Sequence, residues 1–396
     1  MMAQVRKTVV LEGSRGVAEA VRLCRPNVIA AYPITPQTHI VENLSQMVAD
    51  GLLKAENIRV ESEHSAASAV LGASAAGARA YTATTSQGFL LMLEVLYNMA
   101  GLRLPVVLTA VNRGISAPLT IHNDIQDSLA ARDTGFVQLY AEDNQEALDM
   151  HIQAFKIAED HRVLLPVLIG MDGFILTHSF EPVSLPTQEE VDEFLPPYKP
   201  VFYLTPKAPL TMGTKTDPEF YTEARYMLHK AQQNARQVIV EVAQEFKEKF
   251  GRFSGDLIDT YLTEDAEIIF VSMGSLVSNL RAIAQELRQE GKKVGVLKIR
   301  AFRPFPFEEI VRAISGAKIV IVMEKDISLG ATGVLAQEIR AAFYGKANVP
   351  RLSGFVVGLG GRDVTRETVL KGLRLAQESD HLCTFLDLNP ELLEEV

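Results

Sequence analysis

Short apolar runs alternate with helix-like stretches over most of this 396-residue chain. In the first half, the apolar runs cover residues 28–32, 80–84, 106–111 and 165–171. Regular alternation of strand and helix is typical of a parallel sheet whose crossover helices cover its faces. The sequence therefore predicts an α/β fold with a doubly wound sheet.

A second block of the same kind begins at Asp265. Its predicted strands are 267–272, 294–299, 319–323 and 353–357, and a predicted helix covers 279–289. Between the blocks, a proline-rich stretch at 181–218 favours extended loop, and a long polar helix is expected at about 219–250. We therefore divide the chain into residues 1–252, in which 181–252 form an irregular and helical extension, and residues 253–396.

The segment from Val60 to Gln87 is unusual for its small side chains. Glu63 lies at the predicted start of a helix rich in alanine and glycine, and the threonine-rich strand 80–84 follows it. Small residues allow another backbone or a flat ligand to approach closely. Ligands of open α/β sheets bind at the carboxyl ends of strands. We therefore expect a ligand site here.

Composition excludes several classes of protein. The chain has 2 cysteines, Cys24 and Cys383, so it predicts no disulfide framework and cannot supply the four thiolates of an iron–sulfur cluster. The formal net charge of -10 argues against a nucleic-acid partner. Neither a secretory signal nor a run of roughly 20 apolar residues is present. We expect a cytoplasmic protein with no membrane partner.

Six motifs appear in a fixed order along the chain. They are YPITP at 32–36, ESEH at 61–64, TSQG at 85–88, Asn112-Arg113, GFILTH at 173–178 and FRPFP at 302–306. Together they resemble the α subunit of the pyruvate:ferredoxin oxidoreductase family, the thiamine-diphosphate-dependent 2-oxoacid:ferredoxin oxidoreductases. The resemblance implies a pyrimidine-type thiamine-diphosphate-binding domain, followed by a domain like the C-terminal domain of transketolase.

The resemblance implies that Glu63 is a catalytic residue whose carboxyl is hydrogen-bonded to the aminopyrimidine ring of thiamine diphosphate. Such a bond promotes the imino tautomer that accepts the C2 proton, and it gains strength in a low dielectric. Pro33, Ser86 and Gln87 are expected to line the same cofactor pocket. Alternatively, Glu63 only complements the helix dipole, which is worth about 0.3–1 kcal/mol. Glu61 is expected to face elsewhere.

Arg113 closes the apolar strand 104–111 and should project at the carboxyl edge of the sheet. A guanidinium there suits a bidentate contact with a carboxylate, and the resemblance implies that it holds the carboxylate of a 2-oxoacid. Thr35 lies between two prolines that hold its backbone extended, and it is implied to lie beside the substrate. Asn112 is a third candidate for substrate binding. The alternatives are a surface arginine and a turn threonine.

A polar cluster at His122, Asn123, Asp124 and Asp127 invites interpretation as a metal site. Its spacing is not that of a zinc site, so we interpret it as a polar loop near the active site and expect no metal site on this chain. Ser86 also lacks the glycine two residues earlier that a nucleophile elbow needs.

The magnesium motif of thiamine enzymes, Gly-Asp-Gly followed by paired asparagines, is missing, and Met171-Asp172-Gly173 has no such partner downstream. The resemblance implies that a β subunit binds the diphosphate and Mg²⁺. It also implies γ and δ subunits, including a ferredoxin-like subunit with [4Fe–4S] clusters. We expect the small-residue helix after Glu63 and residues 89–97 to meet the partner.

The expected reaction is oxidative decarboxylation of pyruvate with coenzyme A to acetyl-CoA and CO2, with electrons passed to ferredoxin. The same enzyme class could instead act on 2-oxoisovalerate or 2-oxoglutarate. A non-catalytic assembly subunit and a component of a split dehydrogenase are the alternatives from other classes.

Overall fold

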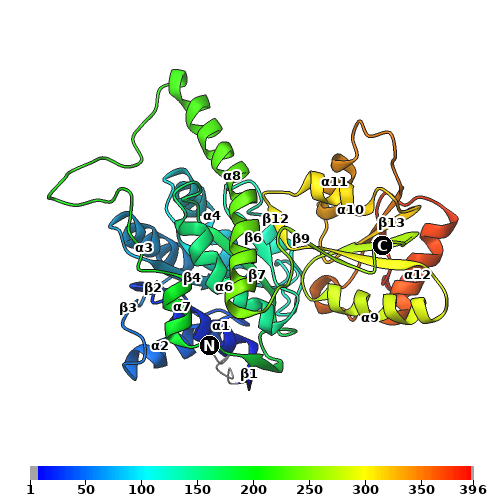
Figure 1. Cartoon of the computed structure of the whole chain (residues 1–396), viewed down its shortest axis with the longest axis horizontal. Helices are drawn as coiled ribbons and strands as arrows, with labels where there is room; N and C mark the ends of the chain where they lie inside the picture. The colour runs from blue at the N-terminus through cyan, green and yellow to red at the C-terminus, as the bar shows by residue number, and fades with distance from the viewer. Residues whose placement is uncertain (1–7, 394–396) are drawn as a thin grey trace.

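The computed structural model describes residues 8–393, whose strands form three sheets (Figure 1). The largest sheet has seven strands. In spatial order they are β12 (Ala301–Arg303), β6 (Val137–Tyr140), β7 (Val167–Asp172), β5 (Val107–Asn112), β4 (Ala80–Thr84), β2 (Val28–Ala30) and β3 (Glu56–Ile58). Neighbouring strands run parallel, except that β12 is antiparallel to β6.

The second block of the chain forms a six-stranded sheet. Its spatial order is β15 (Thr384–Phe385), β14 (Arg351–Val356), β13 (Ile319–Glu324), β10 (Ile268–Ser272), β11 (Val294–Ile299) and β9 (Ile258–Tyr261). Only the pairing of β9 with β11 is antiparallel in this described sheet. A small antiparallel sheet pairs β1 (Thr8–Glu12) with β8 (Phe180–Ser184). The predicted α/β class, with two parallel sheets, is confirmed.

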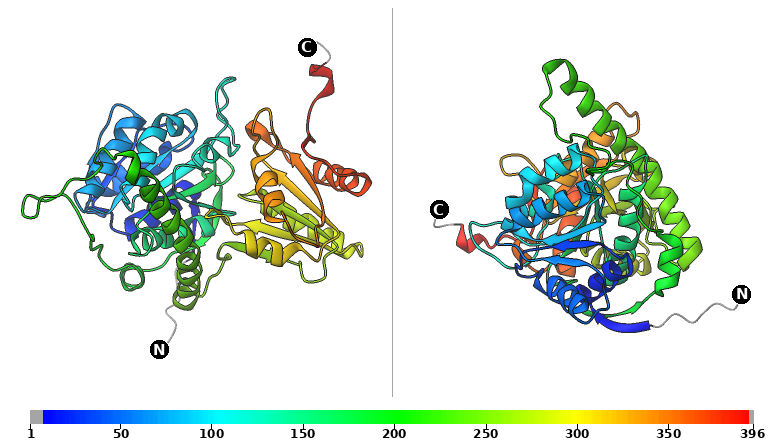
Figure 2. Two further views of the ribbon diagram at one scale, coloured as in Figure 1. Left: turned by 90° about the horizontal axis from the view of Figure 1, so that it is seen from above. Right: turned by 90° about the vertical axis from the view of Figure 1, so that its left-hand side faces the viewer.

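The helices cover both faces of the first sheet. In the first block they are α1 (Gly13–Leu23), α2 (Thr38–Ala49), α3 (Glu63–Ala75), α4 (Ser86–Gly101), α5 (Gln126–Leu129), α6 (Asn144–Glu159), α7 (Gln188–Phe194) and α8 (Pro218–Phe250). Helix α1 contacts α2 and α6, whereas α3 contacts α4. Figure 2 shows these groups on opposite sides of the sheet, as right-handed crossovers require.

The second sheet is covered by α9 (Leu276–Gln289), α10 (Phe307–Ile314), α11 (Val334–Ala342) and α12 (Arg366–Glu378). Two 3₁₀ turns, η1 (Leu359–Gly361) and η2 (Pro390–Leu392), complete this part. No helix within residues 8–393 combines the length and the apolar character needed to cross a membrane.

Buried apolar runs explain the strands that the sequence predicted. Every residue of β4, β5 and β7 is buried, as expected for central strands of a parallel sheet. The eight predicted strands all occur, with ends shifted by at most two residues. The short strands β6 and β12 were not predicted, because Gln138 and Arg303 interrupt their apolar pattern.

The predicted loop at 181–218 was partly wrong. Strand β8 and helix α7 lie in it, and α7 begins with a capping box in which Thr187 and Glu190 satisfy each other's backbone N–H groups. The long helix α8 follows, with Pro218 in its first turn and Gly251 in the left-handed conformation at its end. Its first turns project away from both sheets (Figure 1).

Buried ion pairs join the two blocks. Lys298 Nζ lies 3.1 Å from each carboxylate oxygen of Glu146, and Arg300 Nε lies 3.1 Å from one of them. Buried charges are tolerated only when paired, so these contacts hold α6 against the chain that leaves β11. Strand β12 then adds to the first sheet. The division at residue 252 stays a prediction.

Candidate active site

The carboxyl edge of the first sheet gathers residues that are far apart in the sequence. Thr35 follows β2, Glu63 begins α3, Ser86 begins α4 and Arg113 follows β5. In an open α/β sheet, this edge is where ligands bind. The expected location of the site and the fold therefore agree.

Glu63 is a buried carboxylate at the start of α3. Its exposed fraction is 7%, and the helix start is capped by Ser62, whose hydroxyl accepts the N–H of Ser65 at 3.2 Å. A side chain at Gly88 of α4 would meet Glu63 Oε1 at 2.5 Å, so only glycine leaves room for the carboxylate. Within residues 8–393 no group donates a hydrogen bond to it. A buried carboxylate without a partner is costly, and it is available to a donor on a ligand.

The guanidinium of Arg113 makes one hydrogen bond within the described chain and keeps further N–H donors for a ligand. Nη1 donates to the carbonyl of Thr35 at 2.6 Å, and the side chain is 6% exposed. Nε is buried without an acceptor, and Nη2 also donates to no residue in the described part of the chain. Burial lowers the pKa of Arg113, and the charge of Asp127 partly offsets this. The Nε and Nη2 edge matches the two oxygens of a carboxylate.

Asp127 organises this edge, a role that the sequence did not indicate. Its Oδ2 accepts the backbone N–H groups of Ser86 at 2.8 Å and Arg113 at 3.1 Å. Its Oδ1 accepts from the amide of Asn112 at 2.8 Å and from the N–H of Ser128 at 2.7 Å. Burial raises the pKa of Asp127 to about 7, even though these donors stabilise its charged form. The polar loop around it is therefore structural at this position.

Two predicted site residues point inward. Asn112 is fully buried, and its amide nitrogen donates to Asp127 and Ser128, which favours a positioning role; its contact with a substrate stays a prediction. Ser86 is also fully buried, and its Oγ lies 2.6 Å from the carbonyl of Gly114.

Three residues of the predicted site remain at least partly exposed. Gln87 is half-buried, and its amide donates to the carbonyl of Ser116 at 3.2 Å. Pro33 and Thr35 are exposed at the end of β2. These residues can still face a ligand.

Asp172 at the end of β7 is held by an internal ion pair. Lys325 Nζ lies 2.9 Å from Asp172 Oδ2 and 3.0 Å from Asn123 Oδ1. This ion pair joins the second sheet to the first, and it occupies one carboxylate oxygen of the acidic residue in Met171-Asp172-Gly173. Asp124 of the same loop accepts the N–H of Gly360 at 3.1 Å. The polar loop thus also joins the two blocks.

The fold and site together define a cofactor-binding α/β chain of the thiamine-diphosphate class. Residues 19–244 match the family described as pyruvate flavodoxin/ferredoxin oxidoreductase, thiamine diphosphate-binding. Residues 266–369 match pyruvate:ferredoxin oxidoreductase core domain II. The chain belongs to the pyruvate:ferredoxin oxidoreductase family.

Relatives with assigned names cover nearly the whole chain. The pyruvate synthase subunit PorA of Methanosarcina barkeri is 49% identical over 396 residues, which span 98% of each chain. PorA of Pyrococcus abyssi is 51% identical over 371 residues, covering 93% of this chain and 94% of the relative. The ketoisovalerate oxidoreductase subunit VorA of Pyrococcus horikoshii is 44% identical over 357 residues, covering 90% of each.

Solved structures share the fold. The 2-oxoglutarate:ferredoxin oxidoreductase of Magnetococcus marinus superposes with a TM-score of 0.71 at 20% identity, over 94% of this chain and 65% of that chain. A split-gene transketolase superposes with a TM-score of 0.56 at 14% identity, over 95% of this chain and 100% of that chain. Both support the two α/β domains that the sequence predicted.

Proposed function

We propose that this chain is the α subunit of a pyruvate:ferredoxin oxidoreductase. The complex oxidatively decarboxylates pyruvate with coenzyme A to acetyl-CoA and CO2 and passes electrons to ferredoxin. The observation that carries the proposal is the buried carboxylate of Glu63, which has no partner within residues 8–393 and lies at the sheet edge that also bears Arg113. The identity of 45–51% to pyruvate synthase subunits supports pyruvate as the substrate.

The ketoisovalerate oxidoreductase subunit is 44% identical to this chain, which is only slightly less than the pyruvate synthase subunits. The percentage identity alone therefore distinguishes poorly between the two substrates. Pyruvate is the better-supported substrate because PorA subunits from several organisms match over nearly the full chain. A purely structural subunit is disfavoured because Glu63 and Arg113 are both present with open hydrogen-bonding capacity.

Bound thiamine diphosphate supplies a nucleophilic carbon and an electron sink for decarboxylation. Glu63 would hold the pyrimidine ring by a hydrogen bond, which is strong because the carboxylate is shielded from water. The Nε and Nη2 groups of Arg113 would hold the carboxylate of the 2-oxoacid. Thr35 would orient Arg113 through its carbonyl oxygen.

This chain supplies the pyrimidine side of a shared site. Asp172 is paired with Lys325, and its segment reads Met-Asp-Gly without the paired asparagines that complete the magnesium motif. We therefore assign the diphosphate and Mg²⁺ to a β subunit. Cys24 is buried, which raises its thiol pKa and removes it from cluster binding, so γ and δ subunits would hold the [4Fe–4S] clusters.

The proposal is tested by Glu63→Gln in the reassembled complex. An amide cannot replace the carboxyl at the pyrimidine nitrogen, so turnover should fall by a factor on the order of 10²–10⁴ while the cofactor still binds. Exchange of the C2 proton of thiamine diphosphate, followed by NMR, should slow in parallel.

Glu61→Gln is the matched control. Glu61 is exposed, accepts from the hydroxyl of Ser65 at 2.6 Å and lies two residues from Glu63, so its loss should leave turnover and exchange unchanged. Exchange at the wild-type rate in Glu63→Gln would rule out Glu63 as the activating residue.

A further inference from the structure

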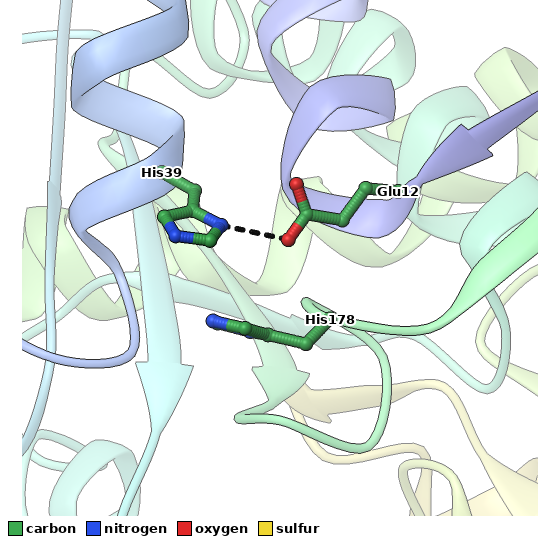
Figure 3. A group of neighbouring side chains, drawn as sticks. All are labelled: Glu12, His39 and His178. Carbon is green, nitrogen blue, oxygen red and sulfur yellow. Dashed lines mark hydrogen bonds and ion pairs between the residues drawn. The ribbon is translucent and has the colours of Figure 1, made fainter.

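Glu12, His39 and His178 converge outside the residues assigned to the active site (Figure 3). Glu12 ends β1, His39 lies in the first turn of α2, and His178 lies in the loop between β7 and β8. One potential ligand atom from each side chain lies within 4.8 Å of the other two. Three elements that are distant in sequence thus direct a carboxylate and two imidazoles into one space.

The three side chains are arranged as neighbouring ligands rather than as one linear hydrogen-bond chain. Glu12 Oε1 lies 2.7 Å from His39 Nδ1, and the His39 and His178 rings lie 4.6 Å apart between centroids. Figure 3 shows the His178 ring beside this pair, with no hydrogen bond joining it to either one. The cluster therefore has unused ligand capacity at His178.

The surroundings of His178 fix its ring as a ligand requires. Its Nδ1 lies 2.8 Å from the hydroxyl of Thr177, and Phe174 packs against the ring with centroids 4.7 Å apart. When Nδ1–H donates to Thr177, the lone pair of Nε2 is free. Metal-binding histidines usually donate their other ring nitrogen to such a partner.

We propose that Glu12, His39 and His178 bind a divalent cation of the zinc class, with solvent as the fourth ligand. Two imidazoles and a carboxylate form a donor set that zinc accepts. Zinc lies roughly 2.0–2.2 Å from such ligands, so bound ligand atoms are at most about 4.4 Å apart. Small side-chain rotations would separate Glu12 Oε1 from His39 Nδ1 and bring His178 within reach of the ion. The His39 side chain is 44% exposed, which gives the ion a route from solvent.

A cation here would hold together the chain around the active site. His39 lies four residues after Thr35, whose carbonyl orients Arg113. His178 lies in the loop after β7, where Gly173 approaches Pro36 so closely that a side chain at Gly173 would meet it at 2.7 Å. The proposed ion would thus fix the segment that carries Thr35. This departs from the expectation that the chain has no metal site.

The test uses the purified full chain after treatment with a chelator. Titration with Co²⁺, followed by visible absorption, and with Zn²⁺, followed by calorimetry, should show one ion per chain. His39→Gln and His178→Gln should each weaken binding by more than about 100-fold. Thr177→Val, which removes the hydroxyl that lies against Nδ1 and also accepts the N–H of Phe174, should weaken it by about 10–100-fold.

His161→Gln is the control, because His161 is exposed and lies outside the cluster. It should bind both metals like the wild type. Zn²⁺ should also raise the melting temperature of the wild type and of His161→Gln but not of His39→Gln. Absence of one-to-one binding, or equal binding by the ligand variants, would show that Glu12 and His39 form only a structural hydrogen bond. These measurements do not involve turnover, so their outcome is independent of the proposed function.

Discussion

Arg113 combines a structural contact and an open hydrogen-bonding edge in one side chain. Its Nη1 is fixed by the Thr35 carbonyl at 2.6 Å, and its backbone N–H is fixed by Asp127 at 3.1 Å. The Nε group has no acceptor in the described chain. A group prepared in this way loses little conformational entropy when it binds a carboxylate.

Arg113→Ala in the reassembled complex should therefore lower kcat/KM for pyruvate by roughly 2–5 kcal/mol of transition-state stabilisation. Arg113→Lys should recover only part of this, because an ammonium cannot form two parallel hydrogen bonds. Steady-state kinetics with pyruvate as the varied substrate measures both effects.

The control is Arg374→Ala, on the exposed face of α12 in the second block. It should leave kcat/KM unchanged. A wild-type kcat/KM in Arg113→Ala would place the carboxylate site elsewhere.

The sequence could place Glu63 at a helix start and Arg113 after an apolar strand, whereas the roles predicted for them came from the resemblance to the family. The role of Asp127 could not be predicted in this way. It depends on N–H groups of Ser86 and Arg113, which are 41 and 14 residues away and which only the folded sheet brings together. The inward orientation of Asn112 was hidden for the same reason.

At the scale of elements, a buried hydrogen-bond chain joins α6 to the first sheet. His151 Nδ1 of α6 lies 2.6 Å from the carbonyl of Ala147, and its Nε2 lies 2.6 Å from Thr109 Oγ1 of β5. The hydroxyl of Tyr81 in β4 lies 2.6 Å from the same Thr109 oxygen. Burial lowers the pKa of His151 to about 4, because protonation would place an unpaired charge in the core.

This predicts a loss of stability in mild acid. An unfolded histidine has a pKa of about 6.5, so between that pH and about 4 the unfolded chain binds more protons than the native chain. The free energy of unfolding should therefore fall as the pH falls through this window, by up to about 3 kcal/mol from His151. Above pH 6.5 this contribution is fully present.

Urea unfolding of the purified chain from pH 7 to pH 4 would measure the effect. His151→Gln should be less stable at pH 7 by about 1–3 kcal/mol, because it weakens a buried hydrogen-bond chain, but its stability should depend less on pH. His161→Gln, an exposed substitution, should keep the wild-type slope. Identical slopes in all three proteins would mean that His151 is not buried neutral.

Elements with strong local signals were predictable. The buried strands β4 and β11 occur at the expected residues, since each is a short run rich in residues that favour strands, threonine and tyrosine in β4 and valine and isoleucine in β11. Strand β12 has only three residues, and its pairing with β6 depends on the second block lying against the first. Such a strand has no local signal. The capping box of α7 is a local signal for a helix, but the prolines around it led to the prediction of a loop.

At the scale of the molecule, two α/β blocks carry the residues that we propose form one half of a shared site. The blocks are joined by Lys298 and Arg300 with Glu146 and by Lys325 with Asp172, and we expect the edge that they hold in place to face a partner subunit. The predicted partner surface, α3 and residues 89–97, lies beside this edge. Leu91 is 51% exposed and lies one helical turn from Gly88, which contacts Glu63.

We expect the chain alone to turn over no pyruvate and to gain activity only with its partner subunits. Leu91→Glu should weaken association with the β subunit by at least about 2 kcal/mol, since it removes the burial of one leucine and desolvates a carboxylate. Native mass spectrometry and an anaerobic ferredoxin-reduction assay measure assembly and activity. Tyr344→Glu, at a side chain that is 92% exposed in the second block, should assemble normally. Equal assembly of both variants would place the partner on another surface, and turnover by the single chain would overturn the shared site.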